Sequence, residues 1–171
     1  LLLVGGAALA DEAALETLAR LKAAGLRVMI DTFPSRQARG AGRFAPDKMA
    51  YFAEMAMADL EGHDLMLLAG TTTPVAFFAY PGKPSVLVPD GCALATLSTR
   101  AEDAVDALAR LAQALDAPAA PAPPLRAARP ELPQGDLTPY ACAQALARHM
   151  PHHAIISDAV SYTHLAGDSQ M

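Results

Sequence analysis

The sequence has few of the features that mark extracellular, membrane or nucleic-acid-binding proteins. No apolar run in its 171 residues approaches the roughly 20 residues that cross a bilayer. Its two cysteines, Cys92 and Cys142, lie far apart without metal-type spacing, and nothing resembles a secretory leader, which predicts a reducing cytoplasm. Only 13 lysines and arginines are scattered along a chain of net charge -5, so a nucleic-acid surface is not expected. A small molecule or another protein is therefore the expected partner.

The first 31 residues show the pattern of a strand, a helix and a second strand. An apolar run at 1–6 ends in two glycines, and Leu15, Leu18 and Leu21 then recur at three-residue steps between charged residues. A second apolar run follows at 26–31. This pattern predicts a βαβ unit.

The pattern of alternating strands and helices continues to about residue 116. We expect a helix from about 48 to 60, strands at 64–70, 85–89 and 93–98, and a helix from 100 to about 115. Apolar strands separated by helices are typical of a parallel sheet that is covered on both faces. The predicted fold class is α/β, a Rossmann-like three-layer sandwich with a mainly parallel sheet.

A change of composition predicts a linker and then the start of a second domain. Residues 117–136 contain six of the fourteen prolines, which favours an extended connector. Thr138 is a good N-cap for a helix that ends at Pro151, and a strand is expected at 153–157. Since too few residues remain to complete an α/β domain, and since the chain opens directly on a strand, we expect both ends to be cut from a longer sequence.

Two glycines and an acid give the first candidate binding site. Gly5 and Gly6 end the first strand, and Asp31 ends the second. In dinucleotide-binding folds such a turn approaches a pyrophosphate and such an acid binds a ribose hydroxyl. The segment lacks the spaced three-glycine fingerprint, so simple turn geometry is the alternative. One functional hypothesis is therefore a stand-alone FAD- or NAD-binding domain.

An arginine-rich loop follows the second strand and gives the second candidate. Arg36, Arg39 and Arg43 are interspersed with Gly40 and Gly42. Guanidinium groups suit carboxylates and phosphates, so the loop could hold an anionic ligand. The alternative is a solvated loop whose arginines pair with acids of a neighbouring domain or subunit.

The segment 71–85 is unusually aromatic for a loop after a strand. It contains Phe77, Phe78 and Tyr80 in a chain that has only nine aromatic residues. Aromatic residues that gather on a surface usually mark an interface or a pocket wall, and local packing under the loop is the alternative. A purely structural or interface module is thus another hypothesis.

Three histidines near the carboxyl end do not predict a metal site. His149, His152 and His153 lie within five residues, but Pro151 breaks the helix between them, so they would not share a face.

The order of these motifs resembles one family, the thiamine-diphosphate-dependent decarboxylases and carboligases, and in particular homologues of the acetolactate synthase large subunit. The resemblance runs from Leu1 to about Asp158. It is carried by DTFPSRQARGAGR (31–43), DLMLLAG (64–70), PVAFFAYPGKPSVLVPDGC (74–92), the linker and LTPYACAQALARHMPHHAIISD (137–158).

The resemblance implies a domain organisation and a chemistry. Residues 1–116 would be the central Rossmann-like domain, 117–136 the Ala/Pro-rich linker, and 137–171 the truncated start of the C-terminal thiamine-diphosphate-binding domain. The parent enzyme would use thiamine diphosphate and Mg²⁺ to act on a 2-keto acid, as a homodimer or homotetramer. Because the catalytic glutamate and the magnesium motif belong to parts that this chain lacks, the fragment alone would be inactive. Asp158 to Ser161 would lie nearest the cofactor diphosphate.

The chain also departs from the family in two places. Flavin-binding relatives use an arginine-bearing loop after the strand that matches DLMLLAG, whereas TTTPVAFF follows it here, so FAD binding is left open. The second departure is VSYTHL at 160–165, which resembles a translated sequencing adapter, and we interpret residues 160–171 as non-natural sequence.

The resemblance also bears on the arginine loop. In this family the corresponding loop runs toward the active-site cleft and the neighbouring chain, which favours an interface role for Arg36, Arg39 and Arg43.

Overall fold

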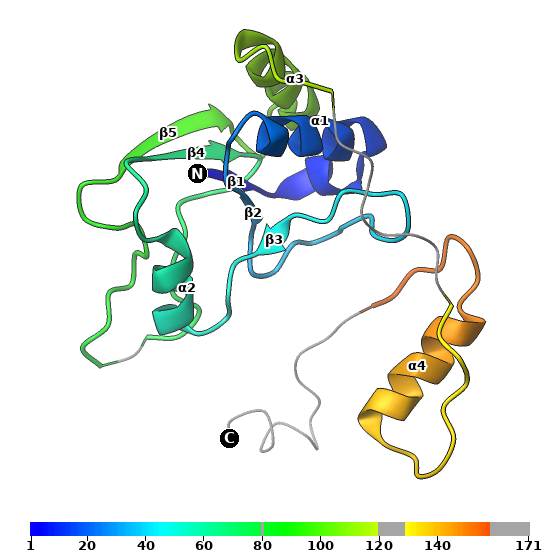
Figure 1. The fold of residues 1–171 in the computed structure, drawn as a ribbon. Coiled ribbons are helices and arrows are strands. Elements are labelled where there is room, and N and C mark those ends of the chain that lie inside the picture. The colour runs from blue at the N-terminus through cyan, green and yellow to red at the C-terminus, as the bar shows by residue number, and fades with distance from the viewer. Residues whose placement is uncertain (80, 120–128, 158–171) are drawn as a thin grey trace. The chain divides into compact units, whose positions relative to one another are not determined.

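The computed structural model describes residues 1–79, 81–119 and 129–157. The chain divides into two compact units, Leu1–Ala127 and Ala128–Met171, and each is considered by itself (Figure 1).

The first unit is built on a five-stranded sheet whose strands are all parallel. The strand order is β3-β2-β1-β4-β5, and Leu3 in the central strand pairs with Met29 on one side and Leu68 on the other. The strands are β1 (Leu2–Val4), β2 (Val28–Ile30), β3 (Asp47–Lys48), β4 (Leu65–Ala69) and β5 (Ala93–Ser98). The predicted α/β fold class with its parallel sheet is confirmed.

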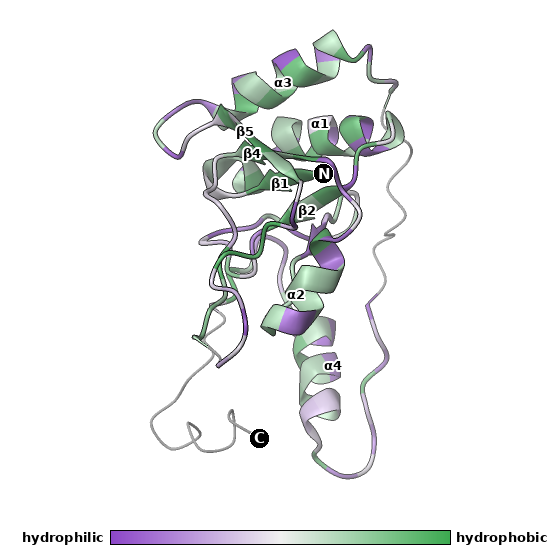
Figure 2. Ribbon diagram, turned by 90° about the vertical axis from the view of Figure 1, so that its left-hand side faces the viewer, coloured by the Kyte–Doolittle hydropathy of each residue, from purple (hydrophilic) through white to green (hydrophobic). Residues whose placement is uncertain are grey.

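Helices cover both faces of this sheet, as the predicted sandwich requires (Figure 1). Successive side chains of a strand point to opposite faces. In β1, Leu2 therefore belongs to the apolar cluster under α1 (Glu12–Ala23) and α3 (Ala104–Ala114). Leu3 belongs instead to the cluster under α2 (Ala53–Leu60). The central strands β1 and β4 are hydrophobic because both of their faces are covered (Figure 2).

Aspartates start the two helices that share a face. The Asp11 carboxylate accepts a hydrogen bond from the Ala14 amide at 2.9 Å, and Asp103 caps α3 in the same way. Each cap satisfies backbone donors that have no partner within the helix. Among the described residues, no helix is long and apolar enough to span a membrane.

Two elements differ from the sequence prediction. The helix expected from about residue 48 begins only at Ala53, because 47–48 pairs with β2 as an edge strand. The expected strand at 85–89 does not join the sheet and makes only an isolated antiparallel bridge between Val86 and Val75. The segment folds back on its own loop, with the Leu87 amide donating to the Pro74 carbonyl at 3.0 Å. These hydrogen bonds use the backbone groups that a sheet strand would need.

The second unit contains α4 (Pro139–His149), which begins where the sequence predicts. Thr138 Oγ1 accepts from the Ala141 amide at 3.1 Å, and Pro139 occupies the first turn. The strand expected at 153–157 is not formed, since 154–157 have no strand pairing and Ile155 is 92% exposed. A strand needs a neighbour, and the described part of this unit contains no sheet for it to join.

Candidate ligand-binding site

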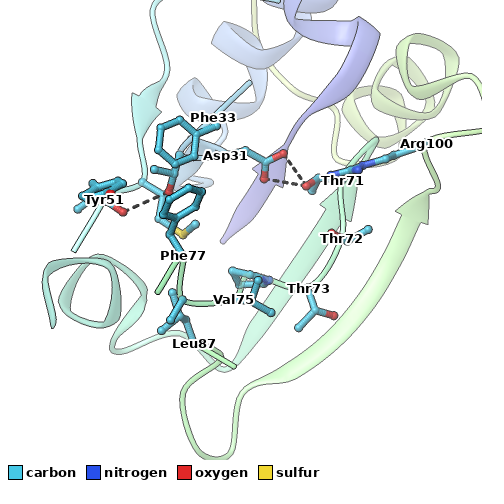
Figure 3. Close-up of a pocket in the computed structure, with 15 residues that line it drawn as sticks. Asp31, Phe33, Tyr51, Thr71, Thr72, Thr73, Val75, Phe77, Leu87 and Arg100 are labelled. Carbon is cyan, nitrogen blue, oxygen red and sulfur yellow. Dashed lines mark hydrogen bonds between the residues drawn. The ribbon is translucent and has the colours of Figure 1, made fainter. Parts of the chain in front are cut away.

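A cavity of about 300 Å³ opens at the carboxyl ends of the strands in the first unit (Figure 3). This edge of a parallel sheet is where α/β proteins usually bind ligands. The cavity is lined by Asp31, Thr32, Phe33, Met49, Ala50, Tyr51, Thr71, Thr72, Thr73, Pro74, Val75, Ala76, Phe77, Leu87 and Arg100.

Three residues from three different strand ends form what we define as the polar end of the cavity, namely Asp31, Thr71 and Arg100. Asp31 follows β2, Thr71 follows β4, and Arg100 follows β5. The hydroxyl of Thr71, a residue that is only 4% exposed, lies 2.7 Å from both carboxylate oxygens of Asp31 and donates to them. Figure 3 shows Asp31 and Arg100 on opposite sides of Thr71. The polar end thus combines a carboxylate, a hydroxyl and a guanidinium.

Burial perturbs the carboxylate at this end. It raises the pKa of Asp31 above its ordinary value of 3.8, and the Thr71 hydrogen bond and the Arg100 charge offset the effect only in part. Perturbed acids in a cleft are typical of functional sites. Asp31 is therefore a candidate for contact with a ligand.

This pKa shift has a consequence for stability. Because the folded state binds the Asp31 proton more tightly than the unfolded chain, the stability contributed by protonated Asp31 is lost as pH rises from about 3.8 through the raised pKa. Replacing Asp31 by asparagine keeps an acceptor for Thr71 and removes the charge. We expect Asp31→Asn to be at least as stable as the wild type at pH 7 and to lose this pH dependence. Thermal melts from pH 4 to 7 measure the stability of the wild type and the variant, with Glu16→Gln as a surface control. A variant that is less stable than the wild type at pH 7 but not at pH 4 would contradict it.

The two glycines after β1 are explained by close packing. Gly5 has extended backbone, but a Cβ there would lie 2.5 Å from Asp31 Oδ2. Gly6 has a φ of 65°, and its Cβ would lie 2.9 Å from the Gly70 carbonyl oxygen. Close packing is thus reason enough for a glycine at both positions, and the cofactor-binding role considered for them stays a prediction.

The start of α1 does not offer a cradle for a pyrophosphate. A 3-10 turn, Gly6–Ala10, lies between Gly5 and the helix, and the Asp11 carboxylate already accepts a hydrogen bond from the Ala14 amide. Glu12 adds a second carboxylate in the first turn. Two acids at a helix N-terminus oppose the binding of an anion there.

Aromatic side chains form one wall of the cavity. We define this aromatic wall as Phe33, Tyr51 and Phe77, whose ring centroids lie 5.0 to 5.7 Å apart. Phe33 and Phe77 are 43% and 58% exposed, so they border both the cavity and the solvent. Phe78 packs edge-on against Phe77, with centroids 4.8 Å apart. Tyr80 lies outside the described residues.

The arginine loop is anchored to its own unit and does not line the cavity. Arg43 Nε donates to Glu12 Oε1 at 2.7 Å, and Arg43 Nη1 donates to the Arg39 carbonyl at 3.2 Å. The Ala38 amide also donates to the Leu9 carbonyl at 2.8 Å. Arg36 and Arg39 are exposed, and an interface role for these arginines stays a prediction.

Sequence reasoning identified Asp31 and Phe77 as candidates but not Thr71, Arg100 or Tyr51. A signal was present for two of them, since Thr71 and Arg100 each come two residues after the end of a strand, β4 and β5 respectively. The rule that ligands bind at the carboxyl ends of strands would have identified Thr71 and Arg100 as candidates.

The predicted cofactor positions Asp158 and Ser161 lie outside the described residues. Within the described part of the chain, no three His, Cys, Asp or Glu side chains gather to form a metal site, and this includes His149 at the end of α4 and His152 and His153 after it.

Comparison with known proteins gives one informative relative. No protein-family profile matches the chain, and no solved structure matches it significantly. The relative is "Putative acetolactate synthase large subunit IlvX" of Mycobacterium tuberculosis (strain ATCC 25618 / H37Rv), which is 43% identical over 158 residues. The match covers 92% of this chain but only 30% of the relative's length. The resemblance seen in the motifs is thereby confirmed, since the chain is similar to an acetolactate synthase large-subunit homologue and spans about 30% of that relative's length.

Proposed function

We propose that the chain is the central domain and the start of the C-terminal domain of a longer, cytoplasmic enzyme that acts on 2-keto acids by decarboxylation or carboligation. The observation that carries this proposal is 43% identity along nearly the whole chain to a relative of which the chain spans only 30%. The proposed domains are 1–116 and 137–171, joined by a linker at 117–136. The boundary between the two compact units, at 127/128, falls inside that linker and supports the division.

Thiamine diphosphate with Mg²⁺ would supply the electron sink for this chemistry. By family resemblance, most of the residues that hold it belong to sequence outside this chain, and Asp158 and Ser161 are the nearest candidates within it. We assign none of the described side chains a role in a reaction step. We therefore expect this chain alone to be inactive.

We propose that the Rossmann-like unit is a scaffold rather than a flavin site. Gly5 is covered by the Asp31 carboxylate, and the first turn of α1 carries Asp11 and Glu12. These residues do not fit the pyrophosphate of FAD or NAD, so the hypothesis of a stand-alone dinucleotide-binding domain is not favoured.

The exposed aromatic residues support an interface in the longer protein. Phe52, Phe77 and Phe78 are 45 to 58% exposed and lie in one continuous group of ring contacts with Tyr51. Clustered exposed aromatic side chains are typical of interface cores. We propose that Phe77, Phe78 and Tyr80, together with Arg36, Arg39 and Arg43, face a neighbouring domain or subunit of a homodimer or homotetramer.

The test uses the longer protein that contains this chain. Pyruvate and larger 2-keto acids are supplied with thiamine diphosphate and Mg²⁺, and substrate consumption is followed with and without the cofactor, with the 171-residue chain as the negative control. Cofactor-dependent consumption by the longer protein, and none by the chain, is expected. A longer protein that neither binds thiamine diphosphate nor consumes any keto acid would refute the proposal.

A further inference from the structure

The cavity at the strand ends has a use that the proposed function does not assign. Its polar end presents a carboxylate and a guanidinium on either side of one hydroxyl, that of Thr71 (Figure 3). The Asp31 carboxylate is half-buried, and among the described residues it accepts hydrogen bonds from Thr71 alone. A buried charge is costly unless a partner of opposite charge neutralises it. The site is therefore chemically suited to a ligand that brings a positive charge to Asp31.

The rest of the cavity sets the other properties of such a ligand. Arg100 also lines the cavity, and its guanidinium suits a carboxylate. Beyond the polar end, Met49 and Leu87 are 6% and 3% exposed and give an apolar floor next to the aromatic wall. A ligand that satisfies all three regions carries an ammonium, a carboxylate and a large apolar group.

The size of the cavity and the charges at its polar end argue against three other classes of ligand, namely dinucleotides, nucleosides and 2-keto acids. A cavity of about 300 Å³ lies at the small end of ligand pockets and does not hold a dinucleotide. A nucleoside could donate hydroxyls to Asp31 but has no anion for Arg100. A 2-keto acid has a carboxylate for Arg100 but brings no positive charge to Asp31, whose burial Arg100 offsets only in part.

We propose that this cavity binds a free α-amino acid with a large apolar side chain, its ammonium on Asp31, its carboxylate on Arg100 and its side chain against the aromatic wall. Because the ammonium and carboxylate of an amino acid are attached to one carbon, they suit two charged groups that flank a single threonine. The inference needs no thiamine diphosphate and does not depend on the proposed function.

Calorimetric titration of the 171-residue chain with L-phenylalanine at pH 7 tests the proposal. Saturable binding is expected, and phenethylamine, 3-phenylpropionate and phenylpyruvate, each lacking one charge of the zwitterion, should bind about tenfold or more weakly. Titration with adenosine tests whether the cavity binds a nucleoside instead. No saturable binding of phenylalanine, or tighter binding of adenosine or phenylpyruvate, overturns the proposal.

Two variants that each remove one charged side chain test which group of the ligand Asp31 and Arg100 bind. Asp31→Asn should weaken phenylalanine and phenethylamine by about tenfold and leave 3-phenylpropionate unchanged, whereas Arg100→Gln should weaken phenylalanine and 3-phenylpropionate and leave phenethylamine unchanged. Arg110→Gln removes a guanidinium that pairs with Asp106 on α3 and serves as the matched control. Thermal melts confirm that each variant is folded. If Asp31→Asn and Arg100→Gln bind phenylalanine as tightly as Arg110→Gln, the site is not where we place it.

Discussion

Replacing Gly70 by alanine is expected to lower the free energy of unfolding of the first unit by about 2 to 5 kcal/mol. Gly70 follows β4 and has a φ of 64°, a left-handed conformation that costs an L-residue about 1 to 2 kcal/mol. A Cβ there would also lie 2.8 Å from the carbonyl oxygen of Gly5, a backbone atom just after the central strand β1 that cannot rotate away. Crowding of this kind adds about 1 to 3 kcal/mol. Urea denaturation followed by circular dichroism measures the loss.

Gly62 provides a matched control for this substitution. It has a φ of 79°, and no atom lies within 4 Å of the position of its Cβ. Gly62→Ala should therefore show only the conformational cost, about 1 to 2 kcal/mol. Equal losses in the two variants would mean that the close approach of the β1 and β4 ends does not constrain the fold.

The glycine contacts also connect the fold to the cavity. Gly5 and Gly70 let the ends of β1 and β4 approach closely, and this approach brings Thr71 within hydrogen-bond distance of Asp31 across Gly5. A half-buried carboxylate with a raised pKa opposes folding at neutral pH. Native proteins retain residues that lower stability mainly where those residues serve function. Asp31 therefore lowers the stability of the fold but is well placed to contact a ligand.

The core of the fold was predictable because its signals are local. Apolar runs at 1–6, 26–31 and 64–70 became β1, β2 and β4, and the leucine spacing between them became α1. The run at 85–89 has the same composition but pairs with its own loop, and hydrophobicity does not specify the partner of a strand. The apolar run at 153–157 stayed unpaired for a related reason, since its described unit has no sheet.

The candidate site was only half predictable because it depends on strand order. Asp31 and Phe77 stood out by type and position alone. Thr71 and Arg100 can be recognised as site residues only once the strand order is known. Because β4 lies beside β1 and β5 beside β4, the carboxyl ends of β4 and β5 lie at the same edge of the sheet as that of β2. Neighbours along the chain do not reveal that order, whereas the structure does.

Replacing Leu108 by alanine is expected to cost the first unit about 2 to 5 kcal/mol of unfolding free energy. Leu108 is fully buried on α3, where it joins residues of α1 and the sheet in one apolar cluster. Truncation removes apolar contacts and leaves a cavity that α3 can close only by shifting toward α1. The chemical-denaturation midpoint should fall while the slope of the transition stays unchanged.

Leu115, which follows α3 and is 46% exposed, supplies the matched control. Leu115→Ala makes the same chemical change outside the cluster, so it should cost less than about 1 kcal/mol. If both variants lost the same small amount, α3 would not be packed on the sheet as a layer of the sandwich. Because α3 and β5 together carry Arg100 between them, loss of that layer should also abolish the amino-acid binding proposed for the cavity.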